Sequence, residues 1–137
     1  MASTLCILAT AAAFGGMLFF AAVMAPLVFA KLPQPTASAF IRQVFPVYYL
    51  VMAGATALAA LLATQVQPAD AVVLATVSVG FLYGRLGLLP RIDQARAQTT
   101  AGDPSAEARF RRLHRGSTVL NAVQLVGVTV TLIRLVS

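Results

Sequence analysis

Residues 71–89 read AVVLATVSVGFLYGRLGLL, an apolar run that ends where Pro90 and Arg91 begin a basic segment. Three further apolar runs cover residues 2–30, 47–64 and 116–136. A helix needs about 20 mainly apolar residues to cross a bilayer, and each run meets this within the usual scatter. None shows the strict alternation of a membrane-spanning strand. The sequence therefore predicts an all-α, polytopic membrane protein, a four-transmembrane-helix bundle formed by one domain over residues 1–137.

The positive charges are distributed unevenly between the two ends of these runs. Of the ten Lys and Arg residues, all but Arg134 lie at or beside one end, and the link over residues 65–70 carries none. Because basic loops stay in the cytoplasm, we expect the loops after the first and third runs to be cytoplasmic. Both termini then lie on the non-cytoplasmic side, with Arg134 reaching the outer interface. We expect a multi-pass membrane protein.

The net charge of +6 raises the question of a nucleic-acid partner. The arginines adjoin apolar runs, where they favour anionic lipid headgroups. The interleaved aromatic and basic pattern of a base-stacking surface is missing. We therefore expect anionic lipids as partners and no nucleic acid. Cys6 is the sole cysteine, which excludes an intrachain disulfide and CxxC redox chemistry.

Prolines suggest where the helices begin and end. Pro46 is expected at the first position of the second helix, and Pro90 is expected to close or kink the third. Asp103 and Pro104 predict the N-cap and first residue of a fourth helix that begins outside the membrane. The first run is too long and lacks the basic start of a signal peptide, so a retained helix is expected. We find no convincing internal repeat, and an inverted-repeat transporter therefore has no support.

Small residues at four-residue spacing predict close helix packing. Gly80 and Gly84 form a GxxxG pair in the third run, and Gly16 with Ala12 forms a similar pair in the first. Such spacing lets two helix backbones approach closely in a membrane. We favour packing inside the bundle, with a face for a homo-oligomer as the alternative.

Polar residues recur on one face of the fourth run. His114, Ser117, Asn121 and Gln124 are separated by steps of three, four and three. Tyr48 and Arg85 belong to other runs at a similar depth. One hypothesis is a polar pocket in the cytoplasmic leaflet, formed by these six residues. The alternative is a hydrogen-bond network that fixes helix register.

A metal site is a weaker hypothesis. His114, Met24 and Met52 all fall in the cytoplasmic half, and imidazole with thioether ligands suits Cu(I). Methionines in apolar helices are usually packing residues. A single histidine excludes bis-histidine haem within one chain. No cofactor is predicted, and copper and haem remain alternatives.

Three motifs mark the helices: GGxxFF from residue 15, FPxYY from residue 45, and FxxLHxxSxxxN from residue 110. Through these motifs the chain resembles the transmembrane-protein-205-like family of small bacterial four-helix proteins, whose eukaryotic relative is associated with cisplatin resistance. The resemblance implies the fold and an inner-membrane location, but no established reaction. It directs attention to His114, Ser117 and Asn121, which lie on the third motif. More distantly, the layout is similar to four-helix modules of copper-resistance proteins.

These observations favour a non-enzymatic role over an enzyme. We expect an accessory subunit of a larger membrane complex, or a binder of a small molecule or lipid in a cytoplasmic-leaflet pocket. One alternative is metal (copper) or drug handling through His114. Another is a small membrane oxidoreductase around His114, Tyr48 and Arg85. Motifs for intramembrane proteolysis and phosphate-loop nucleotide binding are missing.

Overall fold

The computed structural model describes all 137 residues and consists of helices joined by short turns. The elements are α1 (Ala2–Phe19), η1 (Phe20–Met24), α2 (Ala25–Lys31), α3 (Gln34–Ala63), α4 (Pro68–Tyr83), η2 (Gly84–Leu88), α5 (Leu89–Thr100) and α6 (Pro104–Val136). Because η1 and η2 are single π-helical turns within longer helices, the chain forms four rods. All four are long and apolar enough to cross a membrane. The predicted all-α fold is confirmed, with four helices of membrane-spanning length, whereas the side on which the termini lie stays a prediction.

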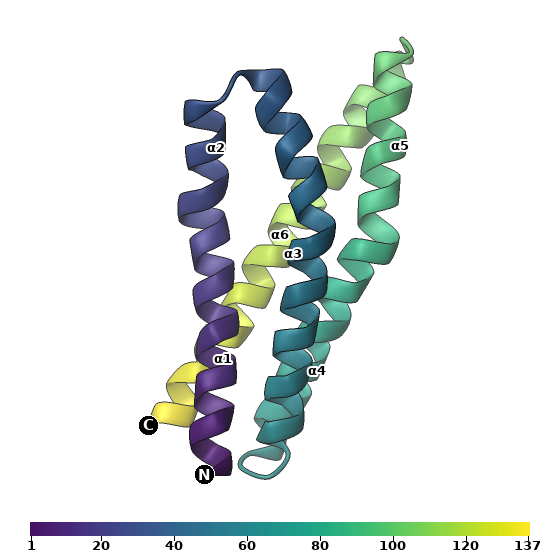
Figure 1. Cartoon of the computed structure of the whole chain (residues 1–137). Helices are drawn as coiled ribbons and strands as arrows, with labels where there is room; N and C mark the ends of the chain where they lie inside the picture. Colours follow the sequence, from purple (N-terminus) through teal and green to yellow (C-terminus); the bar gives the residue numbers. More distant parts are fainter.

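The four rods run back and forth along one axis (Figure 1). Both termini and the α3–α4 turn lie at one end, which we call the terminal end. The α2–α3 and α5–α6 turns lie at the other. We call it the arginine-rich end, because it carries Lys31, Arg42, Arg91, Arg96 and the arginines of residues 109–115. There the α5–α6 pair leans away from α2 and α3 (Figure 1).

The second rod begins earlier than its apolar run. Helix α3 starts at Gln34, and Pro46 lies inside it rather than at its first position, so that prediction was wrong. Pro33 has an extended backbone and Pro35 occupies the first turn, which suits proline because no N–H is needed there. The prediction for α6 is confirmed, since the Asp103 side chain accepts a hydrogen bond from the Ser105 N–H at the N-cap.

Two prolines are accommodated by widened turns. Pro26 and Pro90 follow η1 and η2, and in each case the preceding residue donates its N–H to the carbonyl five residues back. A proline ring inside a regular α-helix would clash with the carbonyl four residues back. The π-helical turn relieves this clash, so both rods continue past their prolines.

The two halves of the chain repeat one layout, which we did not identify in the sequence. Each half has a rod with a π-helical turn followed by proline, and then a second rod. The second rods open with Gln34-Pro35-Thr36-Ala37 and Asp103-Pro104-Ser105-Ala106. Both alanines are fully buried. Since the two hairpins run in the same direction, this is a parallel repeat and not an inverted one (Figure 1).

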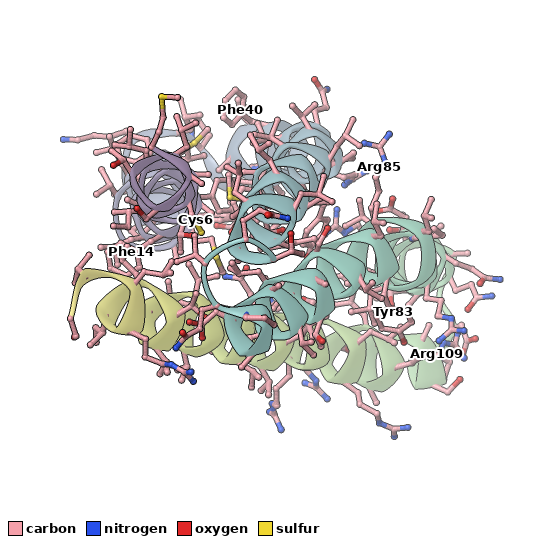
Figure 2. The ribbon with its side chains drawn as sticks, turned by 90° about the horizontal axis from the view of Figure 1, so that it is seen from below. Cys6, Phe14, Phe40, Tyr83, Arg85 and Arg109 are labelled. Carbon is pink, nitrogen blue, oxygen red and sulfur yellow. The ribbon has the colours of Figure 1, made fainter.

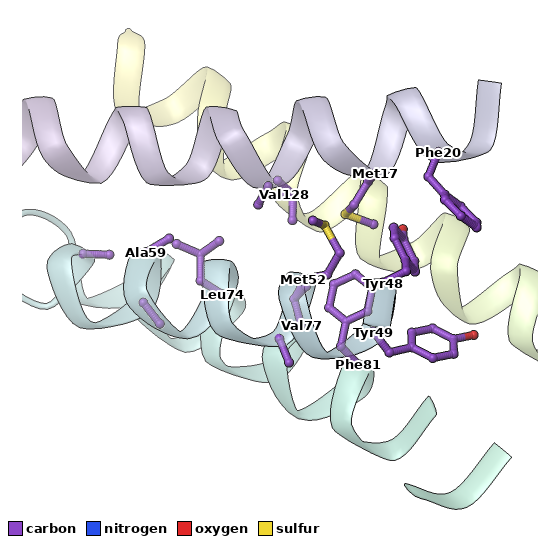
Figure 3. Close-up of a cluster of buried hydrophobic side chains, with 14 of the residues drawn as sticks. Met17, Phe20, Tyr48, Tyr49, Met52, Ala59, Leu74, Val77, Phe81 and Val128 are labelled. Carbon is purple, nitrogen blue, oxygen red and sulfur yellow. The ribbon is translucent and has the colours of Figure 1, made fainter. Parts of the chain in front are cut away.

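The core is narrow, and the outer surface is apolar. Cys6, Ala13 and Ala59 are fully buried where α1 meets α3, because small side chains let the helices approach. Larger core residues follow along the bundle, from Val128 in the middle to Met17 and Phe81 nearer the arginine-rich end (Figure 3). Seen along the axis, Cys6 faces inward, whereas Arg109 extends from the edge of the bundle (Figure 2). Large apolar side chains cover the outside, as expected for a surface in contact with lipid.

Candidate functional site

A cavity of about 240 Å³ lies at the arginine-rich end, between α2, α3, α5 and α6. Its apolar lining consists of Ala25, Phe29, Ile41, Phe45, Leu89 and Ile92. Its polar lining consists of Ser38, Arg42, Tyr49, Asp93, Arg96, His114 and Ser117. The cavity is therefore amphipathic, and all four rods contribute to it.

The cavity crosses the predicted boundary of the membrane. The apolar runs end at residues 30 and 89, so Ala25 and Leu89 lie within them. Arg42, Asp93 and Arg96 lie beyond the runs. The charged part of the lining thus lies where lipid headgroups are expected to meet the protein, whereas apolar lining occurs on both sides of that boundary.

Arg96 is the most unusual polar group in this lining. Its Nη1 is buried and has no hydrogen-bond partner. The guanidinium carbon lies 5.1 Å from the centre of the Phe110 ring, and that ring stacks on His114 with centres 6.0 Å apart. A buried N–H without a partner costs about 1–3 kcal/mol. The positive charge of Arg42 repels that of Arg96, while Asp93 attracts it.

Equivalent residues of the two halves meet at the cavity. With Pro26 and Pro90 in register, Ala25 corresponds to Leu89 and Phe29 to Asp93. With Pro35 and Pro104 in register, Phe45 corresponds to His114. All three pairs line the cavity, as expected if it lies on the axis that relates the hairpins. The second half replaces two aromatic rings of the first with Asp93 and His114.

The predicted polar face of α6 is divided among three environments. Its first two residues, His114 and Ser117, line the cavity, although the Ser117 hydroxyl donates to the His114 carbonyl of its own helix. Asn121 lies deeper, and its Oδ1 accepts a hydrogen bond from the Tyr48 hydroxyl at 3.1 Å. The Tyr48 ring also stacks on Phe20, with centres 4.3 Å apart (Figure 3). This pair joins α3 to α6 below the cavity and does not line it.

Gln124 is buried, and its Nε2 donates to the Val77 carbonyl of α4 at 3.0 Å. The glycines predicted for packing lie near large side chains. A methyl group on Gly80 would lie 2.7 Å from Gln124 Nε2, and one on Gly84 would lie 3.2 Å from Tyr49 Cε1. A methyl group on Gly16 would lie 2.8 Å from Met52 Cε. All three positions allow close approach within the bundle.

Arg85, predicted to belong to the polar pocket, does not line this cavity. Its Nη1 donates to the Pro46 carbonyl at 2.8 Å, which holds the side chain against α3. The methionines proposed as metal ligands also lie outside the cavity lining. Met52 is buried in the core beside Gly16, and Met24 packs at the core's edge. Neither methionine lies with His114 in the cavity lining.

Sequence reasoning missed the charged residues of the cavity because it concentrated on the apolar runs. The helical spacing of these lining residues is nonetheless visible in the sequence. On α3, Ser38, Arg42, Phe45 and Tyr49 follow steps of four, three and four, and all four line the cavity. The step from Ile92 to Arg96 places two lining residues on one face of α5 in the same way.

An ion pair between two rods lies at the terminal end. Asp70 is 1% exposed, and its Oδ1 lies 3.3 Å from Arg134 Nε. The sequence predicted that Arg134 would reach the outer interface, but its partner was not foreseen. Thr131, one helical turn before Arg134, has a buried hydroxyl with no hydrogen-bond partner. The ion pair joins the start of α4 to the end of α6.

Comparison with known proteins gives a family but no activity. No curated protein and no solved structure matches the chain. Residues 8–101 match the family described as a domain of unknown function, DUF4149. The matched segment contains Arg42, Asp93 and Arg96, whereas His114 and Ser117 follow it. Because the match covers more than half of its residues, the chain belongs to the DUF4149 family.

Proposed function

We propose that this protein binds an amphiphilic small molecule or lipid in the cavity at the arginine-rich end. The amphipathic lining is the observation that carries the proposal, since charged and apolar residues from all four rods converge on one space. Ligand pockets typically combine apolar walls with a few well-placed polar groups. The arginines at this end favour the cytoplasmic side, so the ligand enters from the cytoplasmic leaflet.

The size of the cavity supports a partly inserted ligand. Pockets that enclose a whole small molecule are usually about 300–1,000 Å³. At about 240 Å³, this cavity suits one polar group and the beginning of an apolar chain. The rest of the ligand lies in the bilayer, alongside the apolar surface of the rods.

The experiment measures lipid retained after purification in mild detergent. Ser117→Phe fills the cavity from α6, whereas Thr118→Phe on the same helix places the same ring at an exposed residue outside the lining. We expect wild type and Thr118→Phe to retain a similar molar ratio of one amphiphile, and Ser117→Phe to lose it. Equal retention by all three proteins would contradict the proposal.

The other roles stay secondary. An accessory subunit fits the same fold, and it predicts co-purification with a larger membrane complex or a second copy of the chain. Metal or drug handling through His114 predicts a ligand lost on His114→Ala. Neither role accounts for Arg42 and Arg96 in the same cavity.

A further inference from the structure

The charges of the cavity restrict the polar end of its ligand. Arg42 and Arg96 supply two positive charges and Asp93 one negative charge, a formal sum of +1 for these three groups. One singly charged anion neutralises this set. A doubly charged phosphomonoester would leave an excess negative charge beside Asp93.

The hydrogen-bond donors of the cavity suit an oxyanion such as phosphate. Arg96 Nη1 is buried without an acceptor, so an anion that supplies one removes the cost of that N–H. Guanidinium groups bind phosphate oxygens through paired, parallel hydrogen bonds. Arg42 faces the same space from α3, and it repels Arg96 until an anion lies between them.

The two halves of the chain contribute different side chains to the cavity, and this difference orients the ligand. The first half contributes Phe29 and Phe45, while the equivalent positions of the second half are Asp93 and His114. Polar residues therefore predominate on the side of the second half, whereas the first half combines apolar residues with Arg42. A ligand with a charged group and an attached chain is oriented by this difference.

From these observations we infer that the ligand is a phosphodiester lipid, whose phosphate is bound by Arg42 and Arg96. The inference rests on the proposed function, because it names the polar end of the amphiphile. The phosphate lies beyond the apolar runs, at the depth of the headgroups, and the acyl chains pass Ala25 and Leu89 into the bilayer.

Native mass spectrometry of the full chain in mild detergent tests this. The probes are phosphatidylglycerol, which carries a phosphodiester, diacylglycerol, which lacks phosphate, and inorganic phosphate. We expect phosphatidylglycerol to bind at least about tenfold more tightly than diacylglycerol, as charge-assisted hydrogen bonds predict. Arg96→Gln removes this preference. Arg91 is an exposed residue of α5 outside the lining, so Arg91→Gln should keep the preference for phosphatidylglycerol. This variant measures how much an exposed arginine contributes through general attraction to anionic lipid.

The outcomes separate the two proposals. If Arg96→Gln binds phosphatidylglycerol as wild type does while Ser117→Phe does not, the phosphate assignment is overturned and the amphiphile site stands. If neither variant changes binding, both proposals fail. If inorganic phosphate saturates the site as readily as the lipid, the ligand is a free anion and the lipid assignment is overturned. Circular dichroism checks the fold of each variant, and Arg42→Gln replaces Arg96→Gln if the latter unfolds.

Discussion

Gly80→Ala gives a prediction whose sign depends on one neighbouring side chain. The new methyl group would lie 2.7 Å from Gln124 Nε2, so the amide end of Gln124 has to move. That end donates to the Val77 carbonyl, and the residue is only 4% exposed. Moving it breaks a buried hydrogen bond between α6 and α4.

The magnitude follows from two opposing effects. Loss of the hydrogen bond, with the amide left buried, costs about 1–3 kcal/mol. Alanine is favoured over glycine in a helix by about 1 kcal/mol. Since the clash involves the flexible end of a side chain, the backbones need not separate. Subtracting the helix preference from the hydrogen-bond loss leaves a destabilisation of about 0–2 kcal/mol, and we expect about 1 kcal/mol, the middle of this net range.

The assay is a double-mutant cycle on the free energy of unfolding in mild detergent. In a Gln124→Ala background the clash is gone, so Gly80→Ala should now stabilise the fold by about 1 kcal/mol. Gly54→Ala is the matched control, because a methyl group there has no neighbour within 4 Å. It should stabilise both backgrounds equally. The reasoning is refuted if Gly80→Ala has the same effect with and without Gln124.

Three further predictions concern contacts outside the cavity. Tyr48→Phe removes the hydrogen bond to Asn121 and should lower the unfolding free energy by about 1 kcal/mol, an effect absent in Asn121→Ala. Arg134→Gln should lower the melting temperature more than Asp70→Asn does, because Arg134→Gln leaves the buried Asp70 carboxylate without a positive charge. Asp70→Asn leaves only Arg134, whose side chain is 45% exposed. Equal losses of melting temperature would contradict this reasoning. Hydrogen bonds from the Ser105 hydroxyl and N–H lower the pKa of Asp103, the N-cap of α6. The stabilisation by this cap is therefore complete above the ordinary carboxyl pKa of about 3.9, and it is lost as the pH falls through the lowered pKa of Asp103. Amide NMR of the first turn of α6 should show this transition in wild type and not in Asp103→Asn.

The fold could be predicted from the sequence because length and apolarity alone determine how many helices cross a membrane. Boundaries were less predictable. Pro46 resembles a helix start, yet Pro35 supplies an earlier one, and one proline inside a long helix is tolerated where neighbours compensate. The repeat was hidden because the shared features are a turn geometry and two prolines, while most other residues differ.

The candidate site was predictable only in part, because side-chain contacts depend on how each rod is rotated. Periodicity placed His114 and Ser117 on one face, but it did not show that Arg85 turns to the Pro46 carbonyl. The same limit applies to Asp70 and Arg134, whose rods meet only after folding. Arg96 lies outside the apolar runs, so an analysis limited to these runs could not include it.

The central claim is that a lipid phosphate lies against Arg96 in the cavity. Solid-state NMR of the ¹⁵N-arginine-labelled protein in bilayers measures dipolar coupling between the guanidinium nitrogens and lipid ³¹P, with Arg96→Gln identifying the Arg96 signal. We predict a strong, persistent coupling at Arg96, as expected for hydrogen-bonded nitrogen and oxygen about 2.7–2.9 Å apart. A coupling at Arg96 no stronger than that at exposed Arg91 would contradict the account.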